Sequence, residues 1–145
     1  MMKMSEKLID CTKFCGIMNR AIRISGGAAG FARQHNISVQ AVRDTQNLRG
    51  FSPEVVAALG LAMVLRYPLA SDATKLATPQ DVQEKLNNFI REQETQRKAA
   101  QVFGIHESHL SNIQNGLRGF NPVLSILGFG LPVRRFRLKK VEANG

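Results

Sequence analysis

The side chains of this sequence with the most distinctive chemistry are two cysteines and three histidines, which bind metals or serve as nucleophiles and bases. Cys11 and Cys15 lie four residues apart in a predicted helix with no histidine or further cysteine nearby, a pattern that fits neither a disulfide framework nor a zinc site. We predict that both are reduced core residues. His35, His106 and His109 lack the carboxylate or cysteine partners of a metal site or a general base, so we expect them at the surface or in contact with a ligand.

Nothing else in the sequence indicates catalysis. Enzymes of nucleic-acid metabolism use paired carboxylates, a metal cluster, an activated nucleophile or a glycine-rich phosphate loop, and none of these patterns occurs here. We therefore expect no enzymatic activity, no cofactor, no metal and no small-molecule substrate.

The composition indicates a folded protein with a polyanionic partner. Hydrophobic residues make up 43% and charged residues 21% of the 145 residues, and the formal net charge is +9. Both halves of the chain are basic, and lysine and arginine gain affinity for polyanions by releasing condensed counterions. No apolar run reaches the roughly 20 residues that span a bilayer, and no secretory leader pattern is present. We expect a cytoplasmic protein without a membrane partner.

The chain contains an internal repeat. The segment QNLRGFSP at positions 46–53 returns as QNGLRGFNP at positions 114–122, with Gly116 as an extra residue. Further matches precede this segment, among them Asn19 with Asn87 and Ile22 with Ile90. Because the matches include polar as well as apolar positions, we interpret the sequence as a duplication of one unit.

Signals for helix ends place the main elements. Thr78, Pro79 and Asp81 predict the start of a helix that runs to about residue 92, and its counterpart in the first copy is predicted over residues 5–24. Ser-Pro at 52–53 and Asn-Pro at 121–122 predict two short helices that end at glycines 60 and 128.

Short strands are predicted after each copy. Apolar and basic residues alternate over 133–139, and the stretch 63–67 is similarly rich in strand formers. We predict a mainly α protein, with two related helix-turn-helix bundles in tandem and two strands that pair as a small ribbon. The predicted domains are residues 1–70 and 71–145, joined by a linker over residues 68–79 that is rich in small residues.

The second copy has the pattern of a helix-turn-helix over residues 95–116. Gly104 lies where the turn favours a positive φ, and the small Ala100 lies where the two helices cross. The first copy, residues 27–47, keeps Ala32 but has Asn36 at the turn, a residue that tolerates the left-handed conformation. Glycines 26, 27 and 30 are expected to weaken its first helix by about 1 kcal/mol each if they are interior.

On these residues the second copy resembles the phage Cro and lambda-repressor family of helix-turn-helix regulators, over some twenty residues. The resemblance implies that the start and outer face of each second helix contact DNA bases. For the first copy it implies Ser38, Val39, Gln40, Ala41, Arg43 and Asp44 as the base-contacting positions. For the second copy it implies His106, Glu107, Ser108, His109, Ser111 and Asn112.

These side chains suit base edges. Gln40 and Asn112 match adenine, Arg43 matches guanine, Glu107 can accept from cytosine and Val39 can touch a thymine methyl group. We expect the two copies to prefer different half-sites.

Phosphate contacts are expected from Gln96 and the backbone amides beside it, and from Arg49 and Arg118 just after the second helices. Glu107 and Asp44 are less favourable neighbours for phosphate, which leaves open that one copy serves dimerisation.

The resemblance implies a transcriptional regulator of double-stranded DNA, most naturally a repressor of the phage or mobile-element type, that contacts a bipartite operator. A homodimer remains open. The alternative is an antitoxin or phage accessory protein in which one copy binds DNA and the other binds a protein partner, for which exposed apolar surface around Val39 would be evidence.

Overall fold

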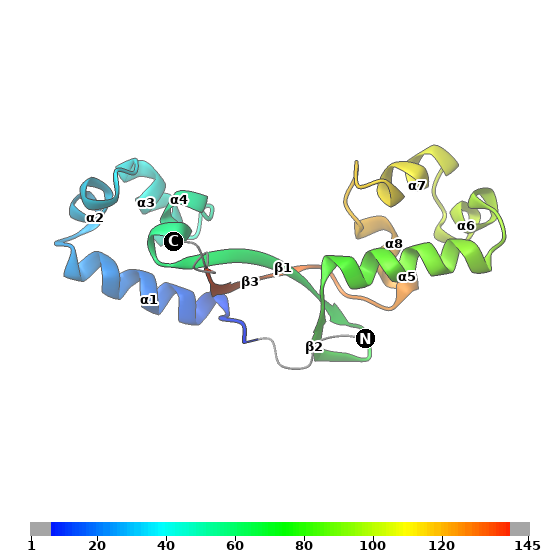
Figure 1. The fold of residues 1–145 in the computed structure, drawn as a ribbon, viewed down its shortest axis with the longest axis horizontal. Coiled ribbons are helices and arrows are strands. Elements are labelled where there is room, and N and C mark those ends of the chain that lie inside the picture. The colour runs from blue at the N-terminus through cyan, green and yellow to red at the C-terminus, as the bar shows by residue number, and fades with distance from the viewer. Residues whose placement is uncertain (1–6, 140–145) are drawn as a thin grey trace, which may run out of the picture. The chain divides into compact units, whose positions relative to one another are not determined.

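The computed structural model describes residues 7–139, which form helices and a small sheet (Figure 1). The helices of this range are α1 (Cys11–Ile24), α2 (Ala28–His35), α3 (Val39–Gln46), α4 (Pro53–Ala58), α5 (Pro79–Glu92), α6 (Gln96–Phe103), α7 (Glu107–Gln114) and α8 (Asn121–Leu127). The strands are β1 (Leu61–Leu69), β2 (Asp72–Ala77) and β3 (Val133–Leu138). The chain is thus a mixture of helix and sheet rather than a mainly helical protein.

The chain divides into two compact units, each with its own core. We call residues 7–64 with 134–139 the first-repeat unit, and residues 65–133 the second-repeat unit. These bounds differ from the predicted domains 1–70 and 71–145, because the end of β1 belongs to the second-repeat unit and most of β3 belongs to the first.

In the first-repeat unit, α1 packs against α2 and α3, and α3 packs against α4. The buried face of α1 carries Phe14, Met18 and Ile22, spaced four residues apart as a helix stripe requires. The helix begins at Cys11 rather than at the predicted residue 5, because the Asp10 side chain accepts a hydrogen bond from the Lys13 amide and caps it. Both cysteines are free and only half-buried at the edge of this core.

In the second-repeat unit, α5 packs against α6, α7, α8 and β2. Its start was predicted correctly. Thr78 Oγ1 accepts from the Asp81 amide at 3.1 Å, while the Asp81 carboxylate accepts from the Thr78 amide at 3.0 Å, which completes a capping box. Its buried face carries Val82, Leu86 and Ile90. The helix α8 begins at Asn121 with Pro122 in its first turn, and it ends at Gly128 in the left-handed conformation.

The end of β1 and most of β3 each pack into the unit of the other repeat. Tyr67, at the end of the first repeat, meets the ring of Phe120 edge-on at 5.9 Å. Phe136, at the end of the second repeat, lies 5.5 Å from the ring of Phe51. Because Phe51 and Phe120 are equivalent positions of the two repeats, the exchange is reciprocal.

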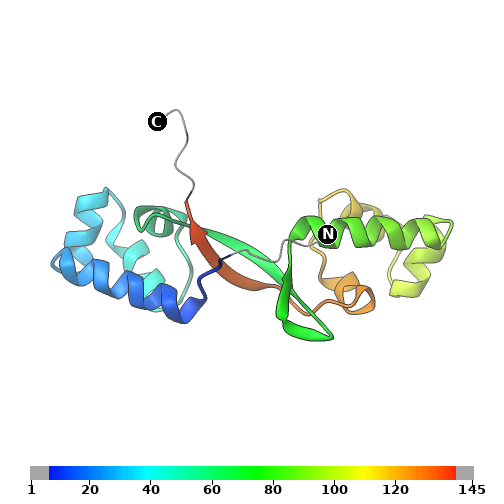
Figure 2. The same ribbon diagram turned by 60° about the horizontal axis from the view of Figure 1, so that its bottom comes forward.

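The three strands form one sheet in the order β2-β1-β3. Figure 2 shows β3 beside β1, as the predicted ribbon requires. Residues 68–79 were predicted as a linker, but most of them form the hairpin of β1 and β2, in which Tyr67 pairs with Ala77 and Pro68 with Leu76. The Pro68 carbonyl accepts from the Gly130 amide at 2.7 Å. Although proline has no amide hydrogen to donate, Pro68 thus bonds as an acceptor to the segment that precedes β3.

The glycines before α2 do not weaken a helix interior as expected. Gly26 and Gly27 precede α2 and have φ angles of 87° and 112°, which L side chains rarely adopt. Gly30 lies inside α2, and a Cβ there would come within 2.1 Å of the Ser25 carbonyl oxygen. Glycine at this position permits a close backbone approach.

Candidate nucleic-acid interface

The second-repeat unit contains a helix, a tight turn and a second helix at α6 and α7. Gly104 ends α6 in the left-handed conformation, with φ 71° and ψ 29°, and the Ile105 amide then donates to the Ala100 carbonyl. This arrangement matches the predicted turn and uses glycine where a Cβ would be strained. Ala100 and Leu110 are buried in the core that holds α6 against α7.

The first-repeat unit forms the same arrangement with α2 and α3. Asn36 takes the left-handed conformation, with φ 56° and ψ 50°, as predicted for the residue that replaces glycine. The Ile37 amide donates to the Ala32 carbonyl, the counterpart of the bond between Ile105 and Ala100 in the other unit. The two repeats therefore share the turn geometry despite different residues.

The outer face of α7 carries the predicted base-contacting side chains. His106, Glu107 and Ser108 are exposed, whereas His109, Ser111 and Asn112 are half-buried. His106 also has a structural role, because its Nδ1 accepts from the Ser108 amide at 3.1 Å and caps the helix. Its Nδ1 lies 2.7 Å from Ser108 Oγ, so these two side chains are coupled before any ligand arrives.

The outer face of α3 is organised differently. Gln40 Nε2 donates to Asp44 Oδ1 at 2.8 Å, so two predicted base-contacting groups are bonded to each other. The Ser38 hydroxyl accepts from the Ala41 amide and caps the helix, and Val39 packs partly against the core. Of the predicted residues on α3, Arg43 combines an exposed side chain with a charge suited to a base or a phosphate.

The predicted phosphate contacts lie near helix ends. Gln96 is the half-buried first residue of α6, where backbone amides have no acceptor within the helix. Arg49 and Arg118 are exposed in the loops after α3 and α7. Sequence reasoning missed Arg97, which is exposed in the first turn of α6, although a basic residue next to Gln96 was a visible signal.

A polar network that sequence reasoning also missed fixes the end of α7. Gln83 Nε2 donates to Asn87 Oδ1 at 3.1 Å and to the Gln114 carbonyl at 3.1 Å, and Gln114 Nε2 donates to Asn87 Oδ1 at 3.2 Å. The network joins α5 to α7, so it restrains α7, the helix that carries the predicted base-contacting side chains of the second copy. The first repeat keeps Asn19 but has Cys15 in place of the glutamine.

The described residues contain no group of three or more His, Cys, Asp or Glu side chains that could hold a metal ion. Among the same residues, no helix combines the length and the apolar character needed to cross a membrane.

Comparison with known proteins gives no match: no family model fits the sequence, and no curated protein or solved structure is similar to it at a significant level.

Proposed function

We propose that this chain is a sequence-specific regulator that binds double-stranded DNA through α3 and α7. The supporting observation is the repeated geometry: in each unit a short helix ends at a left-handed residue, Asn36 or Gly104, and is followed by a second helix with an exposed polar face. This is the arrangement in which helix-turn-helix proteins present a recognition helix to the major groove. The net charge of +9 supports a polyanionic target.

The two recognition helices offer different chemistry, so the proposed site is bipartite and asymmetric. Arg43 on α3 suits guanine, and Asn112 on α7 suits adenine, because each side chain can form two parallel hydrogen bonds with that base. One chain would contact both half-sites, and the operator need not be a palindrome.

The proposed role is that of a repressor of the phage or mobile-element type, acting in the cytoplasm by blocking access of polymerase to DNA. It rests on the resemblance of residues 95–116 to the Cro and lambda-repressor family. The proposal includes no catalytic activity, cofactor or small-molecule substrate.

The decisive experiment is selection of random duplex DNA with the purified protein, followed by footprinting and titration at two salt concentrations. An asymmetric site bound by one chain supports the proposal. Arg43→Ala and Asn112→Ala should each cost about 1–3 kcal/mol on the selected site and much less on random duplex. Arg118→Ala should weaken both by similar factors. Equal losses on both DNAs for all three variants would contradict base contacts by α3 and α7.

A second candidate function has α7 bind DNA while α3 contacts a protein partner. The bond from Gln40 to Asp44 favours it, because these side chains satisfy each other and offer fewer groups to bases. In that case Asn112→Ala would weaken binding to the selected site by about 1–3 kcal/mol, whereas Arg43→Ala would leave the affinity for that site unchanged.

A further inference from the structure

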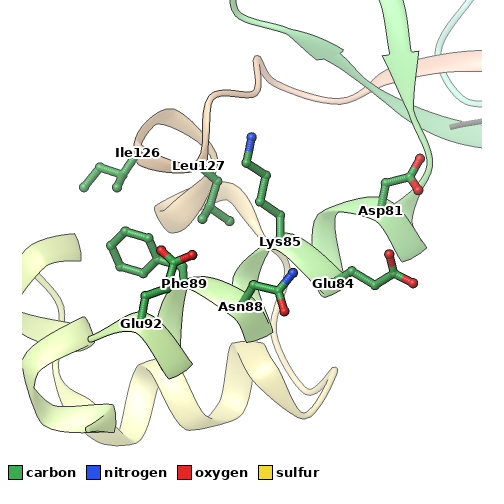
Figure 3. A pocket seen from close by; sticks show the side chains of 8 residues that line it. All are labelled: Asp81, Glu84, Lys85, Asn88, Phe89, Glu92, Ile126 and Leu127. Atoms are coloured by element: carbon green, nitrogen blue, oxygen red, sulfur yellow. The ribbon is translucent and has the colours of Figure 1, made fainter. Parts of the chain in front are cut away.

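A groove in the second-repeat unit lies between the outer face of α5 and the helix α8 (Figure 3). Its volume is about 460 Å³. The apolar lining comes from Phe89, Ile126 and Leu127, and the side chain of Ile126 is 46% exposed. Apolar surface rimmed by polar side chains is typical of contact sites with other proteins.

Carboxylates border this groove. Asp81, Glu84 and Glu92 line it, against Lys85 as the basic residue of the lining. The Lys85 ammonium lies 5.4 Å from the centroid of the Phe129 ring. This ring attracts the ammonium and is not part of the groove lining. The groove is therefore acidic in a chain whose net charge is +9, which makes it unsuited to DNA and suited to a basic partner.

The groove lies on the side of α5 that faces away from α7. Gln83 and Asn87 make the hydrogen bonds to Gln114 of α7. At about 100° per residue, the groove-lining Lys85 and Glu92 project from the opposite side of the helix. A partner can therefore occupy the groove while the outer face of α7 is engaged elsewhere.

The equivalent face of the first repeat has the opposite charge. The positions that match Asp81, Asn88 and Glu92 are Lys13, Arg20 and Ile24. The helix α1 contains no acidic residue, and both Lys13 and Arg20 are exposed. Ile24, the last residue of this helix, is 77% exposed. This face is thus a basic surface with a protruding aliphatic side chain.

We propose that the face of α1 in one copy of this chain docks into the groove between α5 and α8 of a second copy. Ile24 would pack against the apolar floor, and Lys13 and Arg20 would face the carboxylates of Glu84 and Glu92. The two surfaces differ, so the contact is heterologous, and each copy offers one surface of each kind. This contact does not depend on DNA binding.

Two charge-reversed variants test the proposal, each alone and mixed with the other. Their association is measured by sedimentation velocity over a range of concentrations at low and high salt. The groove variant carries Glu84→Lys with Glu92→Lys, and the α1 variant carries Lys13→Glu with Arg20→Glu. The wild-type mass should rise above the 16.0 kDa of one chain as concentration increases, and salt should oppose the rise. Each variant alone should raise the dissociation constant about tenfold or more. An equimolar mixture of the two should associate again, because opposite charges face each other across copies.

The control carries Glu54→Lys with Glu94→Lys, which changes the net charge as the groove variant does but lies outside the groove. It should associate like the wild type. A wild-type chain that stays at 16.0 kDa throughout overturns the proposal. Equal loss in the control overturns it too, as does a mixture that fails to associate.

Discussion

The ring of Phe136 stacks on the ring of Phe14, with centroids 4.0 Å apart and planes inclined by 12°. Phe14 belongs to α1 of the first repeat, while Phe136 comes from β3 at the end of the second. Both side chains are fully buried. The backbones are joined as well, because Ile9 and Phe136 exchange two hydrogen bonds of 2.7 and 2.8 Å. The core of the first-repeat unit is thus completed by the last strand of the described chain.

Phe136→Ala should destabilise the first-repeat unit by about 3–5 kcal/mol, the usual cost of removing a buried phenylalanine ring. Amide hydrogen exchange measured by mass spectrometry should show faster exchange in α1–α4 and near-wild-type exchange in α5–α8. The control is Leu138→Ala on the same strand, since Leu138 is 75% exposed. Uniform acceleration across both units would mean that they unfold together.

The two repeats differ in backbone strain just after α3 and α7. Leu48 has a φ of 60° after α3, and Gly116 has a φ of 79° at the same point after α7. Gly116, the extra residue of the second copy, therefore adopts without a Cβ the left-handed conformation that is strained for Leu48 in the first copy. Because Leu48 is 57% exposed, replacing it sacrifices little packing.

Leu48→Gly should stabilise the first-repeat unit by about 0.5–1 kcal/mol, because it removes a left-handed conformation that is costly for residues with a Cβ. Urea denaturation measures the change. The reverse substitution, Gly116→Ala, should destabilise the second-repeat unit by about 1 kcal/mol. Its Cβ would meet no atom within 4 Å, so only backbone strain contributes. A loss of stability in Leu48→Gly would show that the leucine side chain matters more than its backbone.

Burial raises the pKa of Tyr67, the only tyrosine of the chain, above its usual value of about 10. The unfolded chain then loses the phenolic proton first as pH rises. The stability that Tyr67 contributes is fully present below pH 10 and is lost as pH rises through the folded-state pKa. Phenolate absorbance should therefore give a midpoint above 10 in the folded protein and near 10 in urea.

Tyr67→Phe provides the comparison, because it keeps the ring against Phe120 but cannot ionise. Its stability should fall less steeply above pH 10 than that of the wild type. A folded-state midpoint equal to that in urea would mean that the end of β1 is not held in the second-repeat unit.

Features encoded within a few residues could be predicted from the sequence. The helix start at Thr78, the left-handed turns at Asn36 and Gly104 and the strands β1 and β3 lie where local patterns placed them. The strand exchange could not be predicted, because Tyr67 and Phe136 are equally suited to either core and no local signal decides between them. The hairpin was missed because small residues and Pro68 are also typical of linkers.

The candidate interface was predicted as a set of positions but not as a set of contacts. Exposure of Arg43 and Glu107 follows from helical periodicity. Gln40 and Asp44 lie four residues apart, a spacing at which helical side chains can form a hydrogen bond. Whether that bond occupies groups of the interface depends on which face of α3 is exposed, and the spacing alone does not show this. The network around Asn87 joins residues far apart in the chain, so only the fold reveals it.

Asp44 provides a direct test of whether α3 faces DNA, under the proposed function. Asp44→Asn removes one negative charge while its amide oxygen can still accept from Gln40. Less repulsion from phosphate should raise the affinity for random duplex about threefold at low salt. If the carboxylate accepts from a cytosine in the selected site, the preference at that base pair should fall by about 1–3 kcal/mol. Fluorescence anisotropy with both DNAs measures each effect.

The matched control is Asp72→Asn, which makes the same charge change on β2, a strand that is part of neither α3 nor α7. Attraction through the overall charge alone would move both variants by the same small factor, because distant charges are screened by salt. A larger gain for Asp44→Asn that disappears at high salt places α3 within a few ångströms of the DNA backbone. Equal changes in the two variants would remove α3 from the DNA interface and leave α7 as the single recognition helix.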